Sequence, residues 1–506
     1  MVFELSAFWM LVIILIALFL AKLFSSFYRE STYWKRNGAP YVKSTMVLVK
    51  AWKVLLGFAG FHKYSQFLYN DNQKVRYIGM MDSGRPTIIL RDPELIKQVT
   101  VKSFDHFPDH RSFLTEEMDP IFGKNVFSLR GDRWREMRNT LSPSFTASKM
   151  KFMFGLVSKC CEGFVDYLYD HPELASCLEA KDAFTRYTND VIATVAFGID
   201  VNSLKHRDNE FYLRGADATQ FSGVWRMLKF VAFHLFPRAM RMVGFKFLSR
   251  STTTFFCKTI TETIKARDER GIVRPDMIHL LMQARDEGKR EITDDDIVAQ
   301  AFIFFLAGFE TVSVLMCFAI YELALHPEVQ ERLREEVESH LEDGEISYES
   351  LLKMKYMDMV ISETLRRYPP VFMIDRICEK EFDLPPAAEG YNSVTVQPDN
   401  NVMIPVYGLH MDPQYFPDPE KFDPERFNDE NKNSVNPYVY IPFGMGPRQC
   451  IGNRFALMET KILIVHLLRK FVIKPNEKTM IPMVFKNASF SLIPKDGFWI
   501  SLEKRA

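Results

Sequence analysis

The chain has 506 residues, of which 47% are hydrophobic and 25% are charged. These fractions are close to those of ordinary globular proteins, so they exclude a largely disordered chain. Lys plus Arg and Asp plus Glu number 64 each, and this balance gives no reason to expect a nucleic-acid-binding protein.

The amino-terminal segment predicts a membrane anchor. Residues 5–21 carry no charge, and two apolar residues after Lys22 extend the stretch to about 20 residues, the length that spans a bilayer. Basic residues follow this stretch but do not precede it, so the rest of the chain is expected on the cytosolic side. A cleaved secretory signal is the alternative, although the basic start typical of such signals is missing. We therefore expect an anchor in residues 1–28 and a single domain in residues 29–506.

Most of the remaining sequence places apolar residues at helical spacing, without internal repeats. Strand signals occur near residues 75–90 and again near 394–406. The expected fold is therefore mainly α with a small β-sheet region. Residues 221–248 mix aromatic and basic side chains, which is typical of helices on a bilayer surface; a core helix is the alternative.

A long helix is predicted to begin after Thr293. This residue and the three acids that follow it form a cap and a favourable first turn, and Pro327 ends the helix and starts the next one. The segment is apolar on nearly all faces, so it is expected to cross the middle of the molecule. Glu310 and Glu322 within it argue against a second membrane span.

Two segments after the long helix also have recognisable patterns. Glu363 and Arg366 are spaced one helical turn apart, where their charges can pair. Residues 422–443 are rich in Asn, Asp and Pro and predict an irregular segment.

The cysteine loop, residues 443–452 with the sequence FGMGPRQCIG, carries the strongest chemical signal. Cys450 precedes a predicted helix, whose backbone N–H groups and dipole would stabilise a thiolate. Gly444 and Gly446 allow a left-handed backbone and close approach to a flat ligand, and Gly452 avoids a clash beneath it.

Two further side chains of the loop fit the same purpose. Phe443 would shield the sulfur from water, and Arg448 offers a fork of donors suited to a carboxylate. A thiolate bound to haem iron favours cleavage of the O–O bond of dioxygen. The alternative is an incidental core cysteine in a glycine turn, which the spacing FxxGxRxCxG disfavours. The other cysteines are expected to be small apolar side chains of a reducing compartment: Cys160, Cys161, Cys177, Cys257, Cys317 and Cys378.

The loop resembles the haem-binding signature of the cytochrome P450 family at every defining position, and further matches extend over essentially the whole chain. The resemblance implies the P450 fold with an amino-terminal transmembrane helix, a catalytic haem domain and haem b bound through Cys450. It implies that Trp134, Arg138 and Arg376 hold the haem propionates together with Arg448. It also implies that Glu363, Arg366 and Arg426 are structural, because they lock the irregular segment under the haem.

The segment Ala307-Gly308-Phe309-Glu310-Thr311 resembles the family's oxygen-binding segment. Ala307 and Gly308 are expected to leave space for dioxygen. Glu310 and Thr311 form an acid and alcohol pair, and the Thr311 hydroxyl is the expected proton relay. The same hydroxyl can also bond its own i−4 carbonyl, which does not exclude the relay. Val312 occupies a position where relatives often carry a second Thr or Ser, so the proton path is expected to differ in detail.

Electrons must come from another protein, since the chain lacks a strand-GxGxxG-helix unit for a nicotinamide or flavin cofactor. The resemblance implies NADPH-cytochrome P450 reductase as this partner, with cytochrome b5 as a further candidate. Basic residues are expected to steer the partner, or else to be ordinary solvated charges: Arg133, Arg135, Lys149, Lys151 and Arg454.

The substrate is expected to be a lipophilic small molecule, because the candidate pocket is apolar. Its predicted lining is Phe113, Phe122, Phe127, Phe304, Val371, Phe372 and Met373. The chain looks most similar to insect microsomal members, which implies the endoplasmic reticulum membrane and the detoxification of plant toxins or insecticides. Oxidation of an endogenous hormone, sterol or pheromone is one alternative, and a non-catalytic haem-containing ligand-binding protein is another.

Overall fold

The computed structural model describes residues 32–505 apart from positions 73, 83, 112, 113, 275, 289–291, 432, 433, 488, 490 and most of 220–247, together with scattered positions between 14 and 28. Most of the predicted anchor, most of residues 221–248 and the predicted pocket residue Phe113 lie outside the described residues.

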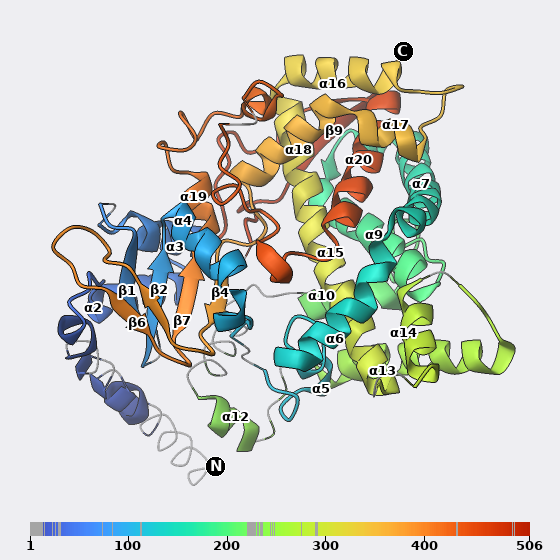
Figure 1. Ribbon diagram of the computed structural model, residues 1–506. Helices are drawn as coiled ribbons and strands as arrows, with labels where there is room; N and C mark the ends of the chain where they lie inside the picture. Colours follow the sequence, from blue (N-terminus) through green and yellow to red (C-terminus); the bar gives the residue numbers. More distant parts are fainter. Residues whose placement is uncertain are drawn as a thin grey trace, which may run out of the picture.

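Helices form the larger part of the molecule, as predicted (Figure 1). The α-helices of the described part are α2 (Ser44–Leu55), α3 (Phe61–Asn70), α4 (Pro93–Lys97), α5 (Pro120–Gly123), α6 (Gly131–Leu141), α7 (Ala147–Asp170), α8 (Pro172–Ala175), α9 (Ala180–Ile192), α10 (Glu210–Thr219), α12 (Pro237–Met242), α13 (Arg250–Arg270), α14 (Met277–Asp286), α15 (Asp294–Leu325), α16 (Pro327–Ser339), α17 (Tyr348–Lys353), α18 (Lys355–Arg367), α19 (Val406–His410) and α20 (Asn453–Lys470). Short 3-10 or π turns are η1 (Gln98–Lys102), η2 (Phe104–His106), η3 (Ser142–Phe145), η4 (Ala193–Phe197), η5 (Pro424–Phe427) and η6 (Gly446–Arg448).

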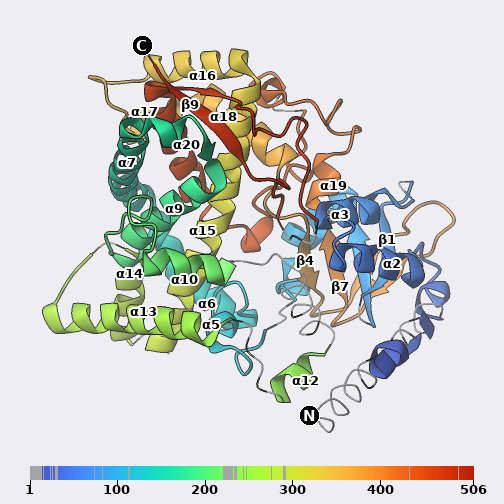
Figure 2. The same cartoon turned by 180° about the vertical axis from the view of Figure 1, so that it is seen from behind.

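The predicted long helix is α15, and it runs through the middle of the molecule (Figures 1 and 2). Thr293 and Asp296 form a reciprocal capping box at its start, and Pro327 begins α16, so both predicted boundaries are confirmed. Among the described helices, α15 alone is long and apolar enough to cross a bilayer. Its apolar residues instead pack against surrounding helices, most extensively α9.

The strand signals near 75–90 and 394–406 are also confirmed. The main sheet has the order β1-β2-β7-β4, and two smaller sheets have the orders β3-β9-β8 and β5-β6. Five strands were not predicted. Four of them have four residues or fewer, which is too short for a period of two to be recognised in the sequence. The strands are β1 (Tyr77–Asp82), β2 (Arg85–Leu90), β3 (Leu178–Glu179), β4 (Ile374–Ile377), β5 (Phe382–Leu384), β6 (Val394–Val396), β7 (Asn401–Ile404), β8 (Phe471–Lys474) and β9 (Trp499–Lys504).

The core consists of two large hydrophobic clusters, one among the helices around α15 and one beneath the main sheet. The cysteine loop lies where they meet. Phe443 and Ile451 pack against the helical cluster, whereas Met445 packs against the sheet cluster. Both halves of the core therefore determine the position of the loop.

Candidate active site

The cysteine loop is closed by its own backbone. The Cys450 N–H donates to Phe443 O at 2.9 Å, and the Gly444 N–H donates to Ile441 O at 3.1 Å. Such bonds satisfy polar groups that would otherwise be buried without a partner. The loop therefore holds Cys450 at a fixed place ahead of α20.

Both predicted turn glycines adopt left-handed conformations, with φ of 77° at Gly444 and 72° at Gly446. A Cβ atom on Gly446 would lie 1.9 Å from the carbonyl oxygen of Thr100 in η1. The small size of Gly446 is thus required by neighbouring backbone, and not only by the approach of a flat ligand.

The Cys450 side chain is accessible to solvent, whereas Cys161, Cys317 and Cys378 are buried. Although the side chain reaches solvent, the protein packed around it partly desolvates the Cys450 thiol and raises its pKa, while a hydrogen bond from the Gly452 backbone and the charge of Arg138 lower it. The predicted thiolate-stabilising groups are present, but burial outweighs them. A coordinated metal ion would supply the remaining stabilisation, because coordination deprotonates a thiol.

Arg448 and Trp134 lie together beside the loop. The Arg448 guanidinium stacks 3.9 Å from the Trp134 ring and pairs with Asp109 at 2.6 Å. It also donates to Pro108 O at 2.7 Å and Leu129 O at 2.9 Å. Arg448 therefore fastens the loop to the 108–129 segment.

Arg138 and Arg376 approach the loop from α6 and β4. Arg138 Nη2 donates to Gln449 O at 2.7 Å, and Arg376 Nη2 donates to Met445 O at 3.2 Å. Arg376 is only 1% exposed, and burial lowers its pKa to about 10. Neither guanidinium has an ion pair with a carboxylate among the described residues, and Arg376 Nε there has no hydrogen-bond partner. Two such cations fit a ligand that carries carboxylates.

Ala307 and Thr311 are accessible positions in a stretch of α15 where Phe305, Phe309 and Val312 are buried. The Thr311 hydroxyl donates to Ala307 O at 2.6 Å, so the i−4 bond considered above is present. A Cβ atom on Gly308 would lie 2.6 Å from Ile192 of α9, so this glycine permits close helix packing. Its role beside the oxygen site stays a prediction.

Glu310 lies in a polar cluster between α15 and α9. The Lys181 ammonium donates to Glu310 Oε2, Ser313 Oγ and Thr185 Oγ1, each at 2.9 Å. Since Thr311 bonds Ala307 instead, the acid and the alcohol have different partners.

The cysteine loop and α15 are joined by intermediate residues. Phe145 stacks on Phe304 of α15, with ring centroids 5.8 Å apart, and lies 4.0 Å from the position a Cβ atom would take on Gly452. Val126 accepts from Arg448 at 3.4 Å and donates to Gln300 of α15 at 2.7 Å. The accessible cysteine and α15 thus belong to one assembly, and the segment before α20 lies beside the middle of α15 (Figures 1 and 2).

The predicted pocket residues differ in accessibility. Phe127 and Val371 are 55% and 48% exposed, whereas Phe122, Phe304 and Met373 are partly buried. Phe372 is buried among rings that include Tyr407 and His62.

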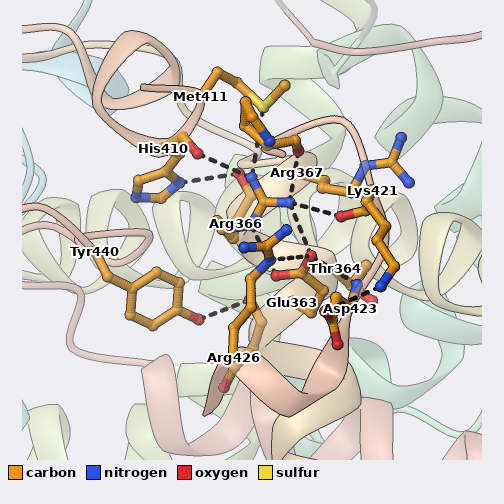
Figure 3. Close-up of polar contacts among 12 residues, drawn as sticks. Glu363, Thr364, Arg366, Arg367, His410, Met411, Lys421, Asp423, Arg426 and Tyr440 are labelled. Carbon is orange, nitrogen blue, oxygen red and sulfur yellow. Dashed lines mark hydrogen bonds and ion pairs between the residues drawn. The ribbon is translucent and has the colours of Figure 1, made fainter. Parts of the chain in front are cut away.

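Glu363, Arg366 and Arg426 meet in a cluster that joins the end of α18 to the irregular segment before the cysteine loop (Figure 3). Arg366 Nε and Glu363 Oε2 are 2.7 Å apart, both side chains are 0% exposed, and Arg426 Nε lies 3.4 Å from Glu363 Oε1. Arg366 also donates to His410 O at 2.9 Å, and the Asp423 N–H donates to Glu363 Oε1 at 3.0 Å. A buried pair with this many partners fixes the irregular segment.

Comparison with known proteins identifies the family. The cytochrome P450 family model matches residues 54–500. The chain belongs to the cytochrome P450 family. It is 45% identical over 505 residues to "Cytochrome P450 9e2" of Blattella germanica, covering 94% of each chain. It is 40% identical over 506 residues to "Probable cytochrome P450 9f2" of Drosophila melanogaster, covering 95% of this chain and 97% of the relative. "Cytochrome P450 6k1" of Blattella germanica is 34% identical over 496 residues, covering 94% and 93%.

The protein is thus a cytochrome P450 monooxygenase, whose family uses haem b and works with redox partners. The residues around the cysteine loop fit this cofactor. The loop presents an accessible sulfur, and the two arginines without carboxylate partners match the two propionates of a haem.

Three residues with evident contacts at the site have no motif that predicts them. Lys181 binds Glu310, Asp109 pairs with Arg448, and His410 lies between Arg366 and Ile441, in the irregular segment that enters the loop. Each partner is far away in the chain, so no local spacing signals the contact.

Proposed function

We propose that Cys450 is the haem-iron ligand and that the reaction takes place between the cysteine loop and the Ala307–Thr311 face of α15. The main support is that Cys450 and Thr311 are both accessible and belong to one packed assembly inside an otherwise buried core. When bound, the haem supplies dioxygen activation and transfer of one oxygen atom to the substrate.

Arg138 and Arg376 hold the two haem propionates in this proposal, and Trp134 and Arg448 complete the binding site. The support is electrostatic, because the two guanidinium groups lack carboxylate partners among the described residues. Arg448 already pairs with Asp109, so it is assigned to fastening the loop as well. Phe443, Gly444 and Gly452 shape the loop around the sulfur, and Glu363, Arg366 and Arg426 fix the irregular segment before it.

Thr311 and Glu310 handle protons in the proposed mechanism. The Thr311 hydroxyl can donate and accept, and it faces accessible space beside Ala307. Glu310 and Lys181 form the polar cluster from which protons are supplied. Ser313 belongs to this cluster and provides a hydroxyl group, whereas Val312 stands where a hydroxyl residue is often found. Delivery of protons by positioned side chains typically accelerates a reaction by about 10²–10⁴-fold.

The proposed substrates are lipophilic xenobiotics such as plant toxins or insecticides. Support comes from the accessible apolar side chains Phe127 and Val371 and from the partly buried Phe122, Phe304 and Met373. Phe113 is retained as a pocket residue, and Phe372 supports the others from the core.

The proposal places the enzyme on the endoplasmic reticulum membrane, with residues 1–28 as anchor, residues 29–506 as the catalytic domain and that domain in the cytosol. In the described part, α2 and the turn after it expose Met46, Val49, Leu56 and Phe58, with Lys50 and Lys53 nearby. Such a surface suits contact with lipid head groups and acyl chains.

NADPH-cytochrome P450 reductase is the proposed electron donor, with cytochrome b5 as a second donor. Of the basic residues predicted to steer it, Arg133, Arg135 and Lys151 already pair with acidic neighbours. Lys149 and Arg454 are therefore the stronger candidates for steering.

The decisive test is the spectrum of the reduced carbon monoxide complex, followed by turnover with NADPH, reductase and candidate toxins. The unaltered protein should show the absorption of a thiolate-ligated haem, and Cys450→Ser should lose it. Cys317→Ala is the matched control, since this buried cysteine has no proposed role. Retention of the thiolate spectrum in Cys450→Ser would contradict the ligand assignment.

Thr311→Ala tests the proton relay. Product formation should fall by about 10²-fold or more while the spectrum stays normal. Thr311→Ser keeps the hydroxyl and should restore most of the activity. Equal activity of the Ala and Ser variants would remove Thr311 from the mechanism.

A further inference from the structure

His410 is the last residue of α19 and is 0% exposed. Its Nδ1 lies 3.2 Å from the carbonyl oxygen of Arg366, and the Ile441 N–H donates to its Nε2 at 3.1 Å. A carbonyl can only accept, so Nδ1 carries the proton and Nε2 is the acceptor. The ring thus links the end of α18 to the irregular segment that enters the cysteine loop.

The hydrogen-bonded path continues from Ile441 to the cysteine. Ile441 O accepts from the Gly444 N–H at 3.1 Å, and Phe443 O accepts from the Cys450 N–H at 2.9 Å. Ile441 itself is buried in the sheet cluster. Three hydrogen bonds and the short backbone segments between them therefore connect the imidazole to the backbone of Cys450.

The surroundings hold the ring in one orientation (Figure 3). Tyr440 stacks on it with ring centroids 5.5 Å apart, and the Phe416 ring lies 6.5 Å away. Arg366 Nη1 donates to the carbonyl of His410 at 2.9 Å, so contacts run in both directions between these residues.

The imidazole is neutral in this setting. Burial and the neighbouring Arg366 charge lower its pKa to about 3. A second ring proton would also face the Ile441 N–H, which already points at Nε2. The acceptor for Ile441 is thus preserved across the physiological pH range.

We propose that His410 is a positioning residue that ties the cysteine loop to the buried Glu363–Arg366 pair and thereby fixes the iron ligand. The inference rests on the proposed role of Cys450. His410 touches neither haem nor substrate in this account; it acts through the backbone of Ile441.

Removing the imidazole leaves the Ile441 N–H buried without this acceptor. The free-energy cost of a buried N–H without an acceptor corresponds to a roughly 5- to 150-fold shift in the equilibrium between an ordered and a displaced cysteine loop. The rest of the fold retains its core, so the loop should loosen before the protein unfolds.

Three substitutions at His410 separate its hydrogen bond to Arg366 from its hydrogen bond to Ile441. His410→Gln keeps a donor and an acceptor at the end of its side chain, His410→Asn keeps a donor near Arg366 but is too short to reach Ile441, and His410→Leu has neither. His466→Leu is the matched control: His466 is also buried, and its Nε2 has no hydrogen-bond partner in the described part of the chain.

The experiment follows two signals of each haem-loaded protein in increasing denaturant: the thiolate-type carbon monoxide spectrum and the helical circular dichroism. We expect His410→Leu and His410→Asn to lose the thiolate spectrum at a clearly lower denaturant concentration than the helical signal. In His410→Gln the two signals should again be lost at the same concentration. His466→Leu should shift both signals together. If His410→Leu does not fold, the Asn and Gln variants decide the question.

Coincident transitions in His410→Asn, or equal behaviour of the Asn and Gln variants, would overturn the positioning role. A failure of the underlying ligand assignment is distinguishable, because the unaltered protein would then lack the thiolate spectrum from the start.

Discussion

The two sides of the cysteine loop are built differently. On one side, Glu363, Arg366 and His410 are 0% exposed and are joined by short hydrogen bonds. The residues proposed to meet oxygen and substrate, such as Thr311 and Val371, are accessible and come from separate segments. The difference indicates that the reaction depends on a rigid framework, whereas substrate choice depends on side chains that can be replaced without disturbing it.

The largest effect is expected from breaking the framework. Glu363→Ala leaves Arg366 buried without its carboxylate, which typically costs about 3–5 kcal/mol. The variant should yield little haem-loaded protein, measured by haem content and thermal melting. Glu425→Ala, which removes an exposed pair with Arg332, should cost at most about 1 kcal/mol. A similar loss of haem content and thermal stability in both variants would show that the buried pair is no more important than an exposed one.

A second test uses Glu459 of α20, a buried carboxyl whose two oxygens lack hydrogen-bond partners among the described residues. Burial raises its pKa well above 4.5, so the folded protein binds a proton that the unfolded chain releases above that pH. The contribution of Glu459 to stability should therefore be largest below about pH 4.5, the pKa of the unfolded chain, and fall by up to about 1.4 kcal/mol per pH unit as the pH rises toward the pKa of the folded protein.

Glu459→Gln should remove this fall, seen in urea unfolding at several pH values. An unchanged slope in the Gln variant would mean that the Glu459 carboxyl is ionised or solvated in the folded protein.

The boundary between framework and cofactor can be examined at Arg376. Arg376→Ala should weaken haem retention by about 1.5–3 kcal/mol, the usual contribution of a hydrogen bond to a charged group. Transfer of haem to an acceptor protein measures this loss. Arg285→Ala is the control, because that arginine pairs with Asp268, Asp286 and Asp294 at the surface. Normal haem retention in Arg376→Ala would assign the propionates to other residues.

The smallest effect is expected on the accessible side. Val371→Phe fills space near the proposed pocket and should change the ratio of kcat/KM between a bulky and a slender substrate by roughly tenfold. The carbon monoxide spectrum and the melting temperature should stay unchanged. A destabilised protein would show that Val371 belongs to the framework instead.

Sequence alone predicted the parts whose signal is local. The capping box at Thr293 and the glycine conformations at Gly444 and Gly446 depend on residues a few positions apart. The family was evident from the cysteine loop for the same reason, since its defining residues are contained in one short segment.

The remaining features depend on distant pairs. Lys181 is 129 positions from Glu310, and His410 is 44 positions from Arg366. The motif predicted that Gly308 belongs to the oxygen segment, but not that a Cβ atom there would meet Ile192 of α9. Such contacts follow from tertiary packing, which periodicity and spacing do not encode.

The ion pair between Asp109 and Arg448 joins positions 339 residues apart. At a synthesis rate of about 5–20 residues per second, Arg448 leaves the ribosome tens of seconds after Asp109. The cofactor site is consequently completed near the end of translation, after most of the helical core can already have formed. A nascent chain that stalls before position 448 would lack Cys450, the proposed haem ligand, together with α20 and the strands β8 and β9.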